Sequence, residues 1–243
     1  MIELGIWLAA VGVGDAVAGL SGHPATRLRA LLGWLGAMAV AVAVASGFAL
    51  GVRTVVALAA VTAATSGIWL LVRLPRVWSS RRAIATALGA LAAFVGSAVL
   101  WGSVRARPAG PLSRWMLRSS FTAVARTRAD RAVLLAGALI AMVATANALG
   151  RLVLAAVGTE VDEPEARLRG GRIIGPMERI LILGSAAAGQ VTAAALVVSA
   201  KSLLRFPEIS RSAERIDAVT EYFLVGSMSS WLIALAPTVL LLR

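Results

Sequence analysis

Long apolar runs separated by short arginine-rich stretches dominate the pattern of this chain. A helix needs about 20 mostly apolar residues to cross a bilayer, because it rises about 1.5 Å per residue through a hydrocarbon core about 30 Å thick. Backbone amides need partners inside lipid, so each such run should be helical. The runs that meet or approach this length are residues 4–20, 28–45, 54–72, 83–104, 132–157, 180–200 and 222–242.

This pattern predicts an all-α fold, a polytopic transmembrane helix bundle in a single domain over residues 1–243. It has about seven spans, or six if the short first run does not cross. Gly47 and Gly51, beside Arg53, mark the predicted tight turn between the second and third spans. Between the fourth and fifth spans, residues 111–128 mix apolar and arginine side chains. Either a short helix lying in the membrane interface or a solvated basic loop would explain this mixture.

Composition agrees with a membrane protein, since 59% of the residues are hydrophobic and the mean hydropathy is +0.84. The formal net charge is +12, but the basic residues lie beside apolar runs. Their expected partners are therefore membrane lipids, with anionic head groups at Arg105–Arg131, and not nucleic acid. The chain has no cysteine and one histidine, His23, so we expect no disulfide, no metal site and no cofactor.

The N-terminus lacks the basic segment of a signal peptide, so the first apolar run is expected to be retained. Heavy use of Ala and Arg, with Lys201 as the sole lysine, is typical of a bacterial chain, and the expected location is the bacterial cytoplasmic (inner) membrane. The positive-inside rule does not fix the orientation, because the two sets of loops carry 12 and 11 basic residues. We favour an inside N-terminus, which places the basic 105–131 loop against anionic lipid.

Arg179, Gln190 and Lys201 are spaced by eleven residues. On one continuous helix this spacing places them on a single stripe about 33 Å long, and Arg205 falls on nearly the same face. Such a helix could line a polar path with Glu178 and Arg179 at one mouth and Lys201 and Arg205 at the other. Alternatively, the cations anchor the helix at the interfaces and Gln190 joins neighbouring helices.

A second ionisable group, Asp15, lies in the first apolar run. A carboxylate inside a membrane needs a cation or a proton, and Arg179, Lys201 and Arg151 are candidate partners. Alternatively, the first run does not span and Asp15 faces water. Trp69, near the end of the third run, is expected at the head-group level.

Three further polar residues lie near predicted helix ends. Asn147 and Arg151 are one turn apart on the fifth span, and Glu221 opens the last span, where the helix dipole favours a carboxylate. The chain has no P-loop, no HExxH and no GxSxG sequence. No catalytic residue is therefore assigned from a motif.

The C-terminal third resembles a group of bacterial integral membrane proteins of unknown function. The resemblance covers about residues 170–235 and rests on several short matches. They are Gly171-Arg172-Ile173-Ile174-Gly175, Glu178-Arg179, Gln190, Lys201-Ser202, Arg205-Phe206, Glu221-Tyr222-Phe223 and Gly226, together with Gly14-Asp15 near the N-terminus. The resemblance implies a membrane location and adds weight to Glu178, Arg179, Lys201, Arg205 and Glu221, but it implies no reaction.

Three functions are compatible with these features. The first is a transporter or channel-like protein for a small ion or anionic solute, with its path at the sixth span and Asp15 or Glu221 as counter-charge. The second is a membrane-embedded enzyme acting on a lipid or lipid-linked substrate, with Glu178, Glu221 or Asp15 as acid or base. The third is a non-catalytic membrane subunit of a larger complex, which would bind a soluble partner through residues 105–131 or 201–217. A homo-oligomer is a further possible assembly.

Overall fold

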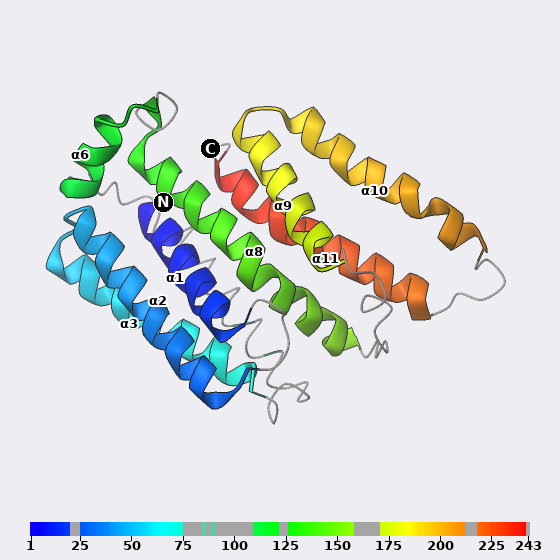
Figure 1. Ribbon diagram of the computed structural model, residues 1–243, viewed down its shortest axis with the longest axis horizontal. Helices are drawn as coiled ribbons and strands as arrows, with labels where there is room; N and C mark the ends of the chain where they lie inside the picture. The colour runs from blue at the N-terminus through cyan, green and yellow to red at the C-terminus, as the bar shows by residue number, and fades with distance from the viewer. Residues whose placement is uncertain are drawn as a thin grey trace. The chain divides into compact units, whose positions relative to one another are not determined.

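The structure is a computed structural model that describes residues 1–19, 25–74, 85, 89, 109–121, 126–157, 171–211 and 218–241. Within these ranges every regular element is helical (Figure 1), which confirms the all-α prediction for the described part of the chain. The predicted span at 83–104 lies almost wholly outside these ranges. The helices are α1 (Ile2–Ala18), α2 (Arg27–Gly47), α3 (Val52–Val72), α6 (Pro111–Leu117), α8 (Ala129–Val157), α9 (Gly171–Ala187), α10 (Val191–Arg211) and α11 (Ala218–Leu241).

Three helical segments of the described chain are long and apolar enough to cross a membrane: Arg27–Gly47, Val52–Val72 and Ala129–Leu154. Shorter apolar helical segments occur at Val191–Ala200 and Leu224–Val239. These lengths and compositions are those of a helical membrane protein. The chain divides into two compact units, Met1–Thr145 and Ala146–Arg243. The hydrophobic pattern carries no sign of this division.

In the first unit, α1 is enclosed by its neighbours, and twelve of its seventeen residues are buried. Glycines allow this close packing. A Cβ added at Gly14 would lie 2.8 Å from the carbonyl oxygen of Gly33 on α2, and one added at Gly5 would lie 2.6 Å from the backbone nitrogen of Leu134 on α8. Helix backbones therefore approach each other closely at these two crossings, as small residues permit in membrane bundles.

The connection between α2 and α3 is the tight turn expected from the sequence. Helix α2 ends at Gly47 and α3 begins at Val52. Within the turn, Ala49 adopts a positive φ of 50°, and its backbone N–H donates to the carbonyl of Ser46 at 2.9 Å.

The predicted interfacial helix over 111–128 is shorter in the structure. Helix α6 covers only Pro111–Leu117 and ends at Arg118, so the predicted helix is wrong for residues 118–121, and residues 122–125 lie outside the described part of the chain. Arg118 caps the helix by donating its backbone N–H to the carbonyls of Arg114 and Met116, and the chain is non-helical through Phe121.

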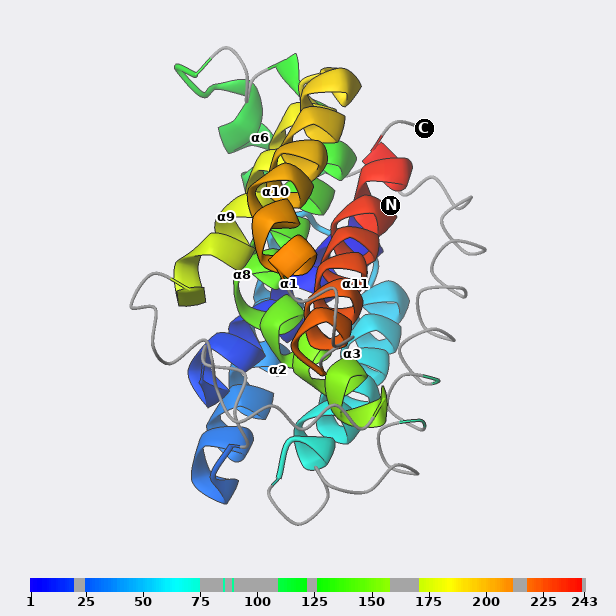
Figure 2. The same ribbon diagram turned by 90° about the vertical axis from the view of Figure 1, so that its right-hand side faces the viewer.

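The second unit contains a helical hairpin where the sequence predicted one span at 180–200. Helix α9 ends at Ala187 and α10 begins at Val191 (Figure 1, Figure 2). The turn is a Schellman motif: Gln190 N–H donates to Ser185 O at 2.8 Å and Gly189 N–H donates to Ala186 O at 2.9 Å. Gly189 has a φ of +78°, which glycine adopts without steric cost.

This hairpin overturns the predicted polar stripe. Arg179 lies on α9, Gln190 lies exposed in the turn and Lys201 lies on α10. The eleven-residue spacing assumed one continuous helix, and the left-handed Gly189 ends that helix. The three residues therefore do not form a 33 Å row across the membrane.

Gly189 offers a direct test of the hairpin. We expect Gly189→Ala to lower the free energy of unfolding by about 1–2 kcal/mol, because an L-residue in the left-handed region carries that cost. A Cβ at this position meets no atom within 4 Å, so crowding adds nothing. Gly184→Ala is the matched control, since Gly184 lies inside α9 with equally open space. It should leave stability unchanged or raise it, and an equal loss in both variants, measured by unfolding in mixed detergent micelles, would contradict the hairpin.

Candidate functional site

Two clusters of buried polar residues occur in the described chain, one in each unit. The first, the Asp15 cluster, consists of Asp15 on α1 with Trp69 and Arg73 at the end of α3. The side chains of Asp15 and Arg73 are 0% exposed, and the guanidinium lies 2.5 Å from a carboxylate oxygen. Asp15 is therefore buried beside a cation, as expected for a carboxylate in an apolar run. The cation is Arg73, which was not among the candidate partners named from the sequence. The alternative in which Asp15 faces water is wrong.

The Asp15 carboxylate also accepts hydrogen bonds from the Trp69 indole, whose Nε1 lies 2.9 Å from each oxygen. Arg73 donates a second N–H to the carbonyl of Gly19 at 3.1 Å, and its own carbonyl accepts from Ala25 N–H at 2.9 Å. The cluster thus ties together α1, α3 and Ala25, which lies two residues before α2. A carboxylate with this many donors is well suited to hold helices in place.

The second cluster, the Glu178–Arg179 site, lies in the other unit. Glu178 and Arg179 on α9 are 6% and 5% exposed. Glu178 accepts a hydrogen bond from the Trp231 indole of α11 at 2.6 Å. Arg179 donates to the side-chain oxygen of Asn147 of α8 at 2.6 Å. Two adjacent ionisable residues are therefore held between two apolar helices.

Two residues of α9, Pro176 and Gly175, influence how the helix holds Arg179. Pro176 lies inside the helix and has no N–H, so the carbonyl one turn earlier receives no helical hydrogen bond from it. A Cβ added at Gly175 would lie 3.0 Å from the Arg179 guanidinium. The missing side chain at Gly175 leaves room for Arg179 beside its own helix.

The contacts show how far the site lies from the ends of α8 and α11. Trp231 lies ten residues before the end of α11, and Asn147 lies ten residues before the end of α8. At 1.5 Å per residue, each leaves about 15 Å of helix beyond the site. The two helices run antiparallel beside the site (Figure 1), and Leu154 of α8 approaches Gly226 of α11. The site is therefore about 15 Å from the end of α8 and about 15 Å from the end of α11.

The structure brings together some of the residues singled out from the sequence. Glu178, Arg179 and Asn147 share one site. Arg151 lies half-buried one turn beyond Asn147. The side chains of Lys201, Arg205 and Glu221 lie outside the part of the chain that the structure describes.

Three important residues were not identified from the sequence: Trp69, Arg73 and Trp231. Trp69 was expected at the head-group level, but it is buried against Asp15. The spacing of Trp69 and Arg73, one helical turn apart, was the available signal that both face one partner. Trp231 lies in the middle of an apolar run, away from the ends where tryptophan is usual in membrane helices.

Comparison with protein-family models, with curated proteins and with solved structures finds no match for the chain. The resemblance of residues 170–235 to uncharacterised bacterial membrane proteins stays a prediction.

Proposed function

We propose that the chain is a multi-pass protein of the bacterial cytoplasmic membrane that moves a small ion or anionic solute, and that its path passes the Glu178–Arg179 site. The observation that carries the proposal is the buried Arg179, held between two apolar helices about 15 Å from the C-terminal end of each. A charged side chain at the bilayer centre costs about 2.5–3.5 kcal/mol on insertion scales, and such residues usually mark ion or substrate pathways.

The sequence of α9 supports the same function, since a glycine and a proline lie inside the helix. Proline and glycine interrupt spanning helices at the binding sites of many transporters, where freed backbone groups line a polar cavity. In α9, Gly175 and Pro176 come directly before the charged pair. In α9, which is helical from Gly171 to Ala187, the glycine, the proline and the charged pair therefore lie within about one helical turn.

In this proposal, Arg179 binds the anion and offsets part of its lost hydration. The hydrogen bond that Arg179 donates to Asn147 fixes one end of the guanidinium, and the planar fork of the guanidinium suits bidentate contact with an oxyanion. Glu178, oriented by the Trp231 indole, limits the affinity by its negative charge. An anion that binds too tightly would not leave, so a weakened site favours passage.

Anion flux into liposomes tests the proposal. The purified chain is reconstituted and assayed with chloride, nitrate, sulfate and phosphate in turn. We expect flux of at least one of these anions, reduced about tenfold or more in Arg179→Gln, since losing a charge contact of about 1.5–3 kcal/mol changes rates by at least that factor. Arg179→Lys should retain more flux than Arg179→Gln because it keeps the charge.

Arg27→Gln is the matched control, because Arg27 is exposed at the start of α2. It should keep wild-type flux. All variants are first checked for a monodisperse profile in detergent. Wild-type liposomes that pass none of the four anions, or an Arg179→Gln variant as active as Arg27→Gln, would overturn the proposal.

A further inference from the structure

Helix α6 is fastened to the turn that joins α2 and α3. Ala109 N–H donates to the carbonyl of Phe48 at 3.1 Å, Leu112 packs over Gly47 and Met116 is buried. Helix α6 therefore cannot move independently of the end of these two helices.

The level of α6 relative to a membrane follows from this attachment. Helices α2 and α3 each have 21 residues and are apolar enough to cross a membrane. Each is about 31 Å long, which matches the hydrocarbon core. The turn between them must lie at the edge of the core, and α6 must lie at the depth of the lipid head groups.

The side chains on α6 and just after it suit this depth. Trp115, Leu117 and Phe121 are 63%, 73% and 71% exposed, and the side chains of Arg114 and Arg118 between them are exposed too. Large apolar groups this exposed are unfavourable in water, whereas an interface accepts both the rings and the cations.

The same end of the first unit is strongly basic. Helix α1 runs parallel to α8 and antiparallel to α2, as the Gly5, Gly12 and Gly14 contacts show. The N-terminus and the start of α8 therefore lie at the α6 end (Figure 1). The described arginines of this end are Arg53, Arg114, Arg118, Arg126, Arg128 and Arg131.

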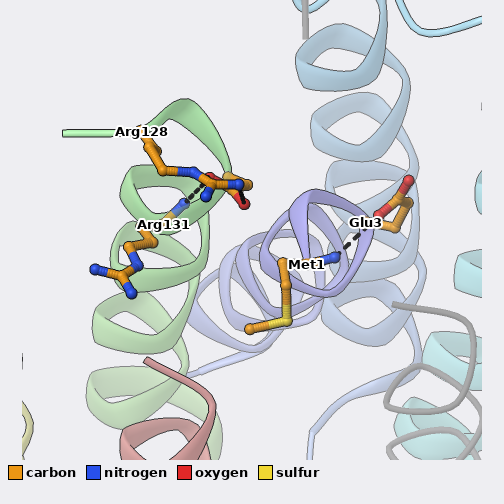
Figure 3. Close-up of polar contacts among 5 residues, drawn as sticks. Met1, Glu3, Arg128 and Arg131 are labelled. Atoms are coloured by element: carbon orange, nitrogen blue, oxygen red, sulfur yellow. Dashed lines mark hydrogen bonds and ion pairs between the residues drawn. The ribbon is translucent and has the colours of Figure 1, made fainter. Parts of the chain in front are cut away.

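Few acidic groups offset these cations. Asp130 pairs with Arg128 at 3.0 Å, and Glu3 pairs with the N-terminal amino group at 3.4 Å (Figure 3). Among the described residues of this end, six arginines and one amino group thus face two carboxylates. A surface of this charge is complementary to an anionic leaflet, which in bacteria and other cells is the cytoplasmic one.

We infer that α6 and residues 118–121 form an interfacial anchor that binds the anionic head groups of the cytoplasmic leaflet, with Arg114 and Arg118 on the phosphates and Trp115, Leu117 and Phe121 among the upper acyl carbons. The N-terminus then lies on the cytoplasmic side. This inference requires a membrane but does not depend on transport, so either proposal can fail alone.

The cysteine-free sequence allows a direct test. Ser120→Cys, at an exposed position beside Phe121, is labelled with an environment-sensitive fluorophore and reconstituted into phosphatidylcholine vesicles with or without phosphatidylglycerol. We expect blue-shifted emission and reduced quenching by acrylamide, a neutral quencher, when phosphatidylglycerol is present. Arg114→Gln/Arg118→Gln should abolish this difference, since two arginines near an anionic surface correspond to about a 30-fold change in the bound-to-free ratio.

The matched control is Arg27→Gln/Arg29→Gln, which removes two exposed arginines from the opposite end of α2 and should leave the response intact. A label at residue 120 that is equally accessible to acrylamide in both vesicles would overturn the inference. So would shielding that depends on protein concentration and not on lipid charge, because a second copy of the chain would then cover α6.

Discussion

Replacing Asp15 with leucine is expected to lower the free energy of unfolding by about 3–5 kcal/mol, the cost of removing one partner from a buried ion pair. Arg73 would keep its charge in a position that is 0% exposed, and the Trp69 indole would lose the acceptor that it now has at 2.9 Å. Unfolding by sodium dodecyl sulfate in mixed micelles measures the loss.

A double-mutant cycle separates the charge from the packing. Asp15→Leu/Arg73→Met removes both charges and keeps apolar volume, so it should be at least about 2 kcal/mol more stable than Asp15→Leu alone. Arg29→Met, at an exposed position of α2, should change stability little. Additive losses in the double variant would mean that Asp15 and Arg73 do not interact in the folded chain.

Gly14→Val is expected to cost about 3 kcal/mol, because overpacking a close helix crossing forces the backbones apart. A Cβ at Gly14 would lie 2.8 Å from the carbonyl oxygen of Gly33 and 3.2 Å from the Cβ of Ala37. Neither atom can move unless α2 itself moves. Thermal unfolding in detergent, monitored through the loss of the monodisperse peak, measures the effect.

Gly36→Ala is the control for this crossing. A Cβ at Gly36 would lie 3.8 Å from the Val17 side chain, an ordinary contact, so the variant should be as stable as the wild type or more so. If Gly14→Val and Gly36→Ala unfold at the same temperature, α1 and α2 do not cross at Gly14.

The apolar runs predicted most of the helices because a segment that crosses lipid must be both long enough and apolar. The predicted runs 28–45 and 54–72 correspond to α2 and α3 within a few residues. Run length and composition suffice here, since each backbone amide must be satisfied within its own helix. The turn at Gly47 and Gly51 was predictable for the same reason, because two adjacent runs need a break.

The hairpin at Gly189 was not predicted because its signal is conformational and not hydrophobic. Apolar residues continue on both sides of the turn, so the run at 180–200 resembles one span. Gly189 following three alanines is a helix C-cap signal, yet the same small residues also suit close helix packing. Hydropathy does not distinguish these two uses of glycine.

The partners of the buried charges could not be derived from the sequence either. Asp15 pairs with Arg73, which is 58 residues away in the chain, and Glu178 meets Trp231, which is 53 residues away. The sequence identified Asp15, Glu178 and Arg179 as costly in a membrane. Which residues compensate that cost depends on how the helices pack.

The central claim is that the Glu178–Arg179 site lies near the middle of the bilayer, and the immersion depth of α11 tests it most directly. Leu224, Met228, Leu232 and Val239 are exposed on α11 and can be replaced singly by cysteine and labelled with a nitroxide in liposomes. Accessibility to oxygen relative to a water-soluble nickel complex then reports depth. The account predicts the greatest depth at residue 232, beside Trp231, and shallower labels at 224 and 239. A label at 232 that the nickel complex reaches as readily as those at 224 and 239 would contradict it.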